Sequence, residues 1–555
     1  MMLSIKTRQI RALSLFFLPL LVGCAVGPNY RPVQAQVPDA WPSIARQYAE
    51  PASPAQSANP ADSGHPANVQ QPATVQPPSS VQPTASGQSP ASEQPSSVLS
   101  SQPLAVTPQP VSVNLPVAPS ENLAKWWTVF NDPVLTKLID DGMAENLDLK
   151  QARLRILQAR AARGVIVSGL FPQVDGVASV ETNRTPVANK GGFIGRISNS
   201  FMHGLDASWE LDFFGGTRRA VEGADAAIDA AIEDRRNVMV TLDGEIGVNY
   251  TSLRQFQKQL AIARDNVASQ QKSVDLTERK FKGGISNALD VANARALVAS
   301  TRAQIPVLET AMQQQIYSLS VLLGREPNAL DQELNIAGPI PAPPPEIPIG
   351  LPSDLLLRRP DIRSAQAQVH AANAQIGVAV ADLFPKFALT GSAGFQGAKQ
   401  SALVNWASRF YTYGANIDWS IFSAGKVQSN IKLQRILTEQ AEVTFHQTVL
   451  TALQDVDNAA FAYAKEKEHH DTLAEEVKAY EQVVTLSIRL YADGNSDFLN
   501  VIVAQRSLYQ AQDALVQSEG ALSIDVVAIY KALGGGWNAP AISECTAPVV
   551  VKDRN

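Results

Sequence analysis

Cysteine and histidine are scarce in this chain of 555 residues, and the shortage excludes several classes of protein. Two cysteines, Cys24 and Cys545, are too few for a disulfide-stapled fold. Among the six histidines only His469 and His470 are close in sequence, and neighbouring residues of a helix point about 100° apart, so they cannot share a metal as an i,i+4 pair would. The sequence also has no glycine-rich phosphate loop and no Gly-x-Ser-x-Gly motif. We therefore expect no enzyme, no metal site and no cofactor.

Positive charge and long apolar runs are also lacking. The formal net charge is -6, and it becomes about -9 if the first 23 residues, with their three basic side chains, are removed. A mildly acidic chain is a poor nucleic-acid binder, because such binders need a basic face. No stretch after Cys24 holds eighteen consecutive apolar residues, so the sequence predicts no transmembrane helix beyond that point.

The N-terminus has the features of a signal peptide over residues 1–23. Basic residues precede Ala12–Leu21, an apolar run too short to span a bilayer as a mature helix. The run leads into Leu-Val-Gly-Cys24, which resembles a bacterial lipobox, with cleavage before Cys24 and a lipid on its thiol. Ala25 follows instead of the Asp that retains lipoproteins in the inner membrane, so the outer membrane is favoured. The alternative is an ordinary buried cysteine near a cleavage site. A lipidated Cys24 also leaves Cys545 without an intrachain partner.

A lipidated segment, residues 24–44, is followed by a proline-rich region at 45–120. Residues 51–120 contain 15 of the 36 prolines, together with repeated Gln, Ser and Ala and only two acidic or basic residues. Such a composition buries too little apolar area to offset the entropy lost on ordering. We predict a disordered linker with some polyproline II character, acting as a spacer; binding of a partner is the alternative.

The rest of the chain is internally duplicated. Residues 152–172 and 365–385 share apolar and glycine positions at an offset of 213, each ending in Leu-Phe-Pro. Residues 281–294 and 491–504 match at an offset of 210. We expect a first repeat over 121–335, a second over 336–535 and a short tail over 536–555, arranged with pseudo-twofold symmetry.

Each repeat contains a long segment that predicts a helix. Residues 217–282 and 426–493 have no proline and carry apolar residues three and four apart, so each would form a coiled-coil-like helix roughly 100 Å long. Each ends at a Gly and is followed by another helix of about 38 residues. We expect Ser286 and Ser496 to be the N-caps of these returning helices, and Pro306 to kink the first.

Between the helices, each repeat contains a predicted β-hairpin, at about 173–214 and 386–422. In the stronger strands, about 205–213 and 413–421, apolar and polar residues alternate strictly over about nine residues. This length and pattern are typical of membrane-crossing strands, although a half-buried soluble hairpin would show the same alternation. Four strands cannot close a barrel, so several chains must share one: two would give eight strands and three would give twelve.

Three motifs carry a resemblance to a known family. They are Cys24-Ala-Val-Gly-Pro-Asn-Tyr-x-Pro, then Trp126-Trp-x-x-Phe-x-Asp-Pro-x-Leu, and Leu351-Pro-x-Asp-x-x-x-Arg-Arg-Pro-Asp-Ile. With them the chain resembles the outer-membrane factor lipoproteins of tripartite efflux systems, the NodT branch of the TolC-like superfamily. The resemblance covers nearly all of the chain outside residues 45–120; relatives mostly lack this proline-rich insert.

The resemblance implies an α+β membrane protein that is mainly α. Four transmembrane strands per chain would join a twelve-stranded barrel in a homotrimer, continued by a long periplasmic helical barrel. It also implies an outer-membrane exit duct for small molecules such as drugs, with a periplasmic adaptor and an inner-membrane transporter, of the RND type or similar, as partners. A protein-secretion channel and a periplasm-spanning structural lipoprotein are the alternatives.

The resemblance also assigns residues to the end of the helices far from the membrane. The adaptor-docking tips would be two matched sets: Phe281, Gly284, Ser286, Leu289 and Tyr491, Gly494, Ser496, Leu499. Leu499 matches a family Leu that narrows the pore, but Val503 stands where relatives have Asp. An electrostatic closed ring is therefore in doubt, and a hydrophobic constriction at Leu499 and Val503 is a substitute. Asp493 and Asp497 could supply acidic charge there or be solvated surface residues.

Overall fold

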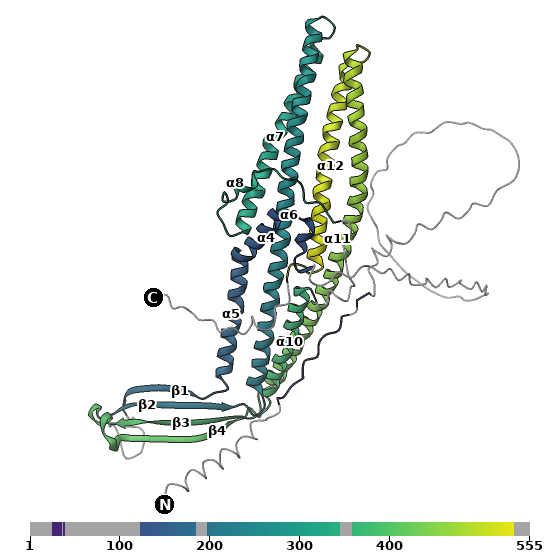
Figure 1. Ribbon diagram of the computed structural model, residues 1–555. Helices are drawn as coiled ribbons and strands as arrows, with labels where there is room; N and C mark the ends of the chain where they lie inside the picture. The colour runs from purple at the N-terminus through teal and green to yellow at the C-terminus, as the bar shows by residue number, and fades with distance from the viewer. Residues whose placement is uncertain (1–24, 36, 39–122, 185–196, 345–357, 538–555) are drawn as a thin grey trace, which may run out of the picture. The chain divides into compact units, whose positions relative to one another are not determined.

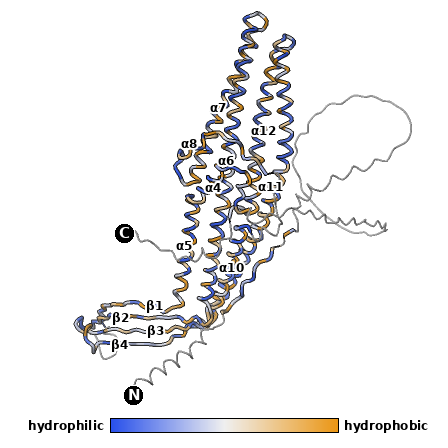
Figure 2. Tube along the Cα trace, in the orientation of Figure 1, coloured by the Kyte–Doolittle hydropathy of each residue, from blue (hydrophilic) through white to orange (hydrophobic). Residues whose placement is uncertain are grey.

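The computed structural model describes residues 25–35, 37–38, 123–184, 197–344 and 358–537 (Figure 1). The predictions for the signal peptide, Cys24, the proline-rich linker and Cys545 lie outside these residues. Among the described helices none is both long enough and apolar enough to cross a membrane. Accordingly, Figure 2 shows polar and apolar residues interspersed along every long helix.

Four long helices dominate the structure, two from each repeat. Helices α6 (Gly216–Lys282) and α11 (Lys426–Ala492) have 67 residues each, in agreement with the predicted segments. Each turns back into a 35-residue helix, α7 (Ala288–Leu322) or α12 (Phe498–Ala532), slightly shorter than the predicted 38. Pro306 lies inside α7, and the helix continues past it. The equal lengths show that the duplication seen in the sequence extends to the helices.

Shorter helices complete the helical layer. Helices α4 (Pro133–Glu145) and α5 (Leu147–Ser168) belong to the first repeat, together with a single turn, α8 (Asp331–Leu334). Helix α10 (Pro360–Ala381) is the counterpart of α5 in the second repeat. Near the sheet the neighbouring helices follow the order α5–α6–α10–α11, and towards the helix tips the order is α7–α6–α12–α11 (Figure 1). Helix α11 therefore forms one edge of the layer, and α5 and α7 form the other.

The strands form one antiparallel sheet in the order β1-β2-β3-β4. Its members are β1 (Gln173–Arg184), β2 (Ile197–Leu211), β3 (Lys386–Gly397) and β4 (Arg409–Asp418). Two short 3-10 helices, η3 (Gln400–Val404) and η4 (Trp406–Ser408), connect β3 to β4. The central β2–β3 pair joins the two repeats, so the two predicted hairpins make a single surface.

The second strand of each hairpin begins earlier than the alternation predicted, at Ile197 and Arg409, and ends two or three residues earlier. Pairing with the preceding strand extends the start, since Ile197 pairs with Arg184 and Arg409 pairs with Phe395. The end of β2 is set by Asp212, whose carboxylate accepts hydrogen bonds from the first backbone N–H groups of α6. Tertiary contacts therefore determine boundaries that alternation alone cannot.

A matched pair of tryptophans ties the sheet to the helices. Trp209 donates its indole N–H to the carbonyl of Leu170 at 2.9 Å, and Trp419 donates to the carbonyl of Leu383 at 3.1 Å. Both carbonyls belong to the Leu-Phe-Pro turn that ends the helix before each hairpin. The duplication thus conserves a contact between the two layers as well as the backbone.

The Trp-Trp motif lies in the main hydrophobic core. Trp126 is fully buried and stacks on Tyr530, with ring centroids 5.7 Å apart. Asp132 caps α4 by accepting from the Val134 N–H at 2.8 Å, and its other oxygen accepts the hydroxyl of Tyr250 at 2.7 Å. The motif therefore joins the first helices to α6 and α12, and its role is structural.

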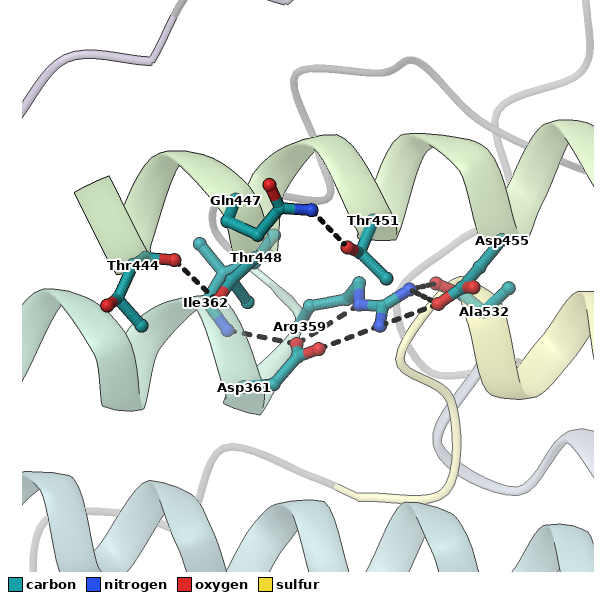
Figure 3. A network of polar contacts seen from close by, with 9 residues as sticks. All are labelled: Arg359, Asp361, Ile362, Thr444, Gln447, Thr448, Thr451, Asp455 and Ala532. Carbon is teal, nitrogen blue, oxygen red and sulfur yellow. Dashed lines mark hydrogen bonds and ion pairs between the residues drawn. The ribbon is translucent and has the colours of Figure 1, made fainter. Parts of the chain in front are cut away.

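The Arg-Arg-Pro-Asp motif holds the start of α10 against α11 and α12 (Figure 3). The Arg359 guanidinium pairs with Asp361 at 2.7 Å and with Asp455 at 3.1 Å, and it donates to the carbonyl of Ala532 at 3.1 Å. Three elements thus converge on one side chain at the point where α12 ends and α10 begins. An Arg fork suits this position because it offers several fixed donors.

The segment just after residue 24 is held on the helical layer. Buried Arg219 donates to the carbonyl of Val26 at 3.1 Å and to the side chain of Asn29 at 2.7 Å. Tyr30 stacks on His370, with centroids 4.2 Å apart. The chain next to the predicted lipid site is therefore fixed close to the junction of helices and sheet.

Candidate functional site

The two helix tips share one turn geometry. Gly284 and Gly494 adopt φ of 73° and 81°, and the residue after each donates its N–H back to Lys280 or Leu490, both at 2.9 Å. The glycine N–H groups themselves donate to the carbonyls of Phe281 and Tyr491. This is the Schellman ending of a helix, in which positive φ favours glycine. The predicted need for glycine at both turns agrees with this geometry.

The predicted N-caps are wrong by one residue. Helix α7 is capped by Asn287, whose side-chain oxygen accepts the N–H of Asp290 at 2.8 Å. Ser286 instead bonds the Asp290 carboxylate. The corresponding cap of α12 is Asp497, without a side-chain cap bond, and Ser496 precedes it. The Asn amide reaches the third N–H of the helix, so the helix begins one residue later than a serine cap would place it.

The first tip presents apolar side chains to its surroundings. Phe281 is exposed, and Ile285 and Leu289 keep 73% and 65% of their surface accessible. Phe281 and Leu289 were predicted for this tip from the sequence, whereas Ile285, which directly follows the positive-φ glycine, was not. A β-branched apolar residue in a two-glycine turn was the signal that could have revealed it.

At the second tip the equivalent aromatic residue is buried. Tyr491 is 6% exposed and packs against Phe498, which is 2% exposed, with ring centroids 5.0 Å apart. The Lys280 ammonium lies 4.5 Å from the Tyr491 ring centroid and donates to the Tyr491 carbonyl. The Tyr491 hydroxyl is 3.4 Å from Ser286 Oγ. Tyr491 thus connects the two helical hairpins, and its side chain is not presented for docking.

The two residues expected at the constriction lie one turn apart near the start of α12. Both Leu499 and Val503 are exposed in the subunit. Asp493 and Asp497 are exposed as well, in the turn before them. The structure therefore offers an apolar pair on one helix face with two carboxylates close by in the chain.

In the part of the chain that the structure describes, no three His, Cys, Asp or Glu side chains gather as a metal site. His469 and His470 each lie 3.3 Å from a carboxylate oxygen, of Glu466 and Asp471 respectively. The tips themselves present apolar side chains, turns and a few charges.

Comparison with known proteins places this geometry in a family. The profile described as "Outer membrane efflux protein" matches residues 138–325 and 351–535. The chain is 32% identical over 429 residues to the pyoverdine export outer membrane protein OpmQ of Pseudomonas aeruginosa, covering 76% of this chain and 89% of the relative. It is 33% identical to the solvent efflux pump outer membrane protein SrpC of Pseudomonas putida, covering 74% and 87%. Nodulation protein T of Rhizobium leguminosarum bv. viciae is 31% identical, covering 76% and 86%.

Solved structures of outer-membrane channels have the same fold as this chain. The outer-membrane channel OprN superposes with a TM-score of 0.70 at 35% identity, covering 75% of this chain and 93% of that one. CusC superposes with a TM-score of 0.68 at 28% identity, covering 78% and 100%. The predicted fold class, mainly α with four strands in the manner of trimeric outer-membrane channels, is confirmed. The family consists of channel proteins rather than enzymes. The chain belongs to the outer membrane efflux protein family, as its motifs predicted.

Proposed function

We propose that three copies of this chain form one duct, which serves as the outer-membrane component of a tripartite pump. The chain is an outer-membrane exit duct for efflux, and we infer that it performs no chemistry of its own. Energy for transport would come from an inner-membrane transporter of the RND type or similar, reached through a periplasmic adaptor. The lipid on Cys24 would anchor each subunit beside the junction of helices and sheet.

The observation that carries the proposal is that the sheet and the helical layer have matching edges. Strand β1 follows α5 directly, and β4 leads into α11, so one side of the subunit is β1 with α5 and α7, and the other is β4 with α11. Among the described strands, the outer sides of β1 and β4 have no partner. In lipid such strand edges must be paired. If β4 of one copy pairs with β1 of the next, the strand edges are satisfied, and α11 of the first copy is brought beside α5 and α7 of the second.

Exposed apolar side chains mark the same two edges of the helical layer. On α11, Ile436, Val443 and Leu450 recur every seven residues, and Leu147 and Leu154 do so on α5. Further exposed residues are Leu433, Leu437, Phe461, Val483, Leu486 and Leu490 on α11, and Val307, Tyr317 and Val321 on α7. A heptad-spaced stripe such as that on α11, facing exposed apolar residues on the other edge, is typical of helices that pack side by side. Three copies are favoured because eight strands would enclose a lumen filled by side chains.

The sheet supports a membrane position. Its register places the alternating apolar residues of all four strands on one face and most of the polar ones on the other. Aromatic residues lie at both ends of the apolar face: Phe387 near the helices, and Phe395 and Tyr411 at the far end. Between Phe387 and Phe395 the strand extends about 26 Å, close to the apolar height of outer-membrane barrels. The apolar face would contact lipid and the polar face would line the duct.

The helix tips are the proposed docking site for the adaptor. They hold exposed apolar residues beside two glycines, and nothing lies within 4 Å of a methyl group added at Gly284 or Gly494. A partner backbone can therefore approach these turns closely. The matched residues Ser286, Ser496, Leu289 and Leu499 belong to the same surface, with Tyr491 in a positioning role. Leu499 and Val503 would form the apolar constriction.

Drug susceptibility of a deletion strain tests the function. Export through this duct predicts that the strain becomes sensitive to a defined set of compounds and that the wild-type chain restores resistance. The matched control is Gly494→Ile, which should reach the outer membrane as a trimer yet fail to restore resistance. Unchanged susceptibility to every compound, in a strain whose pump genes are expressed, would contradict the proposal.

A further inference from the structure

The two faces of the sheet carry charge of opposite sign. On the apolar face the charged or ionisable residues within the described strands are Arg184, His203 and Arg409, and none is acidic. On the polar face Asp175, Glu181, Asp206, Glu210 and Asp418 are acidic, against Lys386 alone. Charges on a lipid-facing surface are costly unless they meet a partner of opposite sign. The cations on the apolar face therefore require an explanation.

The two arginines of the apolar face lie at one end of the strands. Arg409 is the first residue of β4 and pairs with Phe395, and Arg184 is the last residue of β1. Both ends lie away from the helices, because the helices join the sheet at Gln173, Leu211, Lys386 and Asp418 (Figure 1). If the helices extend into the periplasm, as the proposed function requires, the cations lie at the outer leaflet.

The Arg409 side chain packs against Trp406 and is still exposed to solvent. Its guanidinium carbon lies 4.7 Å from the Trp406 ring centroid, and Nη1 donates to the Trp406 carbonyl at 3.1 Å. Trp406 itself is 69% exposed. The contacts fix the guanidinium but use few of its five N–H donors, and no carboxylate pairs with it among the described residues. An Arg held in this way is suited to bidentate binding of phosphate.

Beside Arg409 the apolar face is hollowed. An open depression of about 650 Å³ is lined by Gly176, Ala178, Leu205 and Ala393 of the strands, together with Phe395, Trp406 and Tyr411. His203, which lies between Ala178 and Phe395 in the register, stacks on Phe395 with ring centroids 5.4 Å apart. Gly176 and Ala393 flank the exposed side chain of Leu205 in the register, and these small neighbours leave room on both sides of it. The depression can therefore hold hydrocarbon chains, and the Arg409 guanidinium at its edge can bind an anion.

We propose that this hollow binds the phosphorylated, acylated glucosamine lipid of the outer leaflet, with a phosphate on Arg409 and acyl chains over Gly176, Ala178 and Ala393. The ligand combines the two chemistries that the surface offers, dense negative charge on the sugar and several acyl chains. The proposal rests on the proposed function, since it needs the strands to cross the outer membrane. Bound lipid would neutralise Arg409 and cover the concave part of the lipid-facing surface.

The test is native mass spectrometry of the full-length, detergent-extracted protein titrated with bis-phosphorylated hexa-acyl lipid A. Arg409→Gln should weaken binding about tenfold, because a charge-assisted bidentate contact is lost. Arg409→Lys should restore part of it. Arg302→Gln, an equal charge change at an exposed position of α7, should leave binding unchanged. Phosphatidylglycerol, anionic but without the sugar, should bind more weakly in every variant.

Equal weakening in Arg409→Gln and Arg302→Gln would overturn the site, and so would phosphatidylglycerol binding as tightly as lipid A. The same spectra report the number of chains. A trimer that binds no lipid A contradicts only the lipid site, whereas a monomer contradicts the proposed function itself.

Discussion

The two helix tips have the same backbone and different surfaces. Both end in a Schellman turn with a positive-φ glycine, and both lead into a 35-residue helix. Phe281 is exposed at the first tip, while its counterpart Tyr491 is buried at the second. The two repeats therefore share the turn geometry but differ in which side chains they bury.

The difference in burial separates the matched residues that are accessible to a partner from those that hold the subunit together. Tyr491 receives Lys280 from the other hairpin and packs on Phe498, so it holds the two hairpins together. Phe281, Ile285 and Leu289 contact solvent and are available to a partner. Sequence equivalence alone would assign both sets the same role. Substitutions at matched positions can separate the two roles.

The largest effect is expected at the glycines, where the tips are alike. Gly284→Ile and Gly494→Ile should each abolish cross-linking to the adaptor and raise drug sensitivity nearly to that of a deletion. The local strain is only about 1–2 kcal/mol, since the space around both turns is open. Trimer amount and outer-membrane location should therefore be normal. Undiminished cross-linking in a correctly located variant would move the docking site elsewhere on the duct.

The aromatic pair, where the tips differ, comes next. Tyr491→Ala should destabilise the helical hairpins by about 3 kcal/mol, because a buried aromatic residue and its contact with Lys280 are lost. Phe281→Ala should change stability by less than about 0.5 kcal/mol but reduce adaptor cross-linking. Thermal unfolding of the trimer, monitored by circular dichroism, measures the change in stability. The yield of cross-linked adaptor measures docking. Equal stability losses in both variants would contradict the division of roles.

The proposed constriction belongs to the second tip only, and there the effect on conductance should be moderate. Leu499→Ser and Val503→Ser should raise the ion conductance of the closed duct in planar bilayers, because a polar residue removes the barrier to wetting. The matched change Leu289→Ser at the first tip should leave conductance unaltered. If Leu289→Ser opened the duct as much as Leu499→Ser, the constriction would not be confined to α12.

The smallest effect concerns the caps. Asn287→Ala removes the hydrogen bond between the Asn287 side chain and the Asp290 N–H, and it should lower the stability of α7 by about 1 kcal/mol. Asp497→Ala removes no such bond and should lower the stability of α12 by only a few tenths of a kcal/mol. Hydrogen exchange of the first turn of each helix measures both. Comparable loss of protection in both helices would show that the two caps are equivalent.

Much of the fold could be predicted because it depends on patterns that local physics controls. The long proline-free segments, the Gly turns and the alternating strands all lie close to where the sequence predicted them. The start of β2 at Ile197 could not be predicted, because it depends on pairing with Arg184 across the hairpin. The cap at Asn287 was missed for a similar reason: Ser and Asn are both good caps, and only the backbone decides between them.

The turns at the helix tips could be predicted in position, whereas their docking role stays a prediction. Matched glycines located both tips, since positive φ restricts the residue there. The burial of Tyr491 depends on Phe498 and on Lys280, which comes from a different helix. No periodicity within one repeat reports such a contact. The lipidation of Cys24 and the role of the proline-rich insert stay predictions.

The mass of the detergent-extracted complex shows whether matching edges make several chains share one duct. The account predicts three chains per particle, with the strand content of the subunit retained. A monomeric particle with an intact four-stranded sheet would contradict it, because β1 and β4 would then lie in the membrane with unpaired edges.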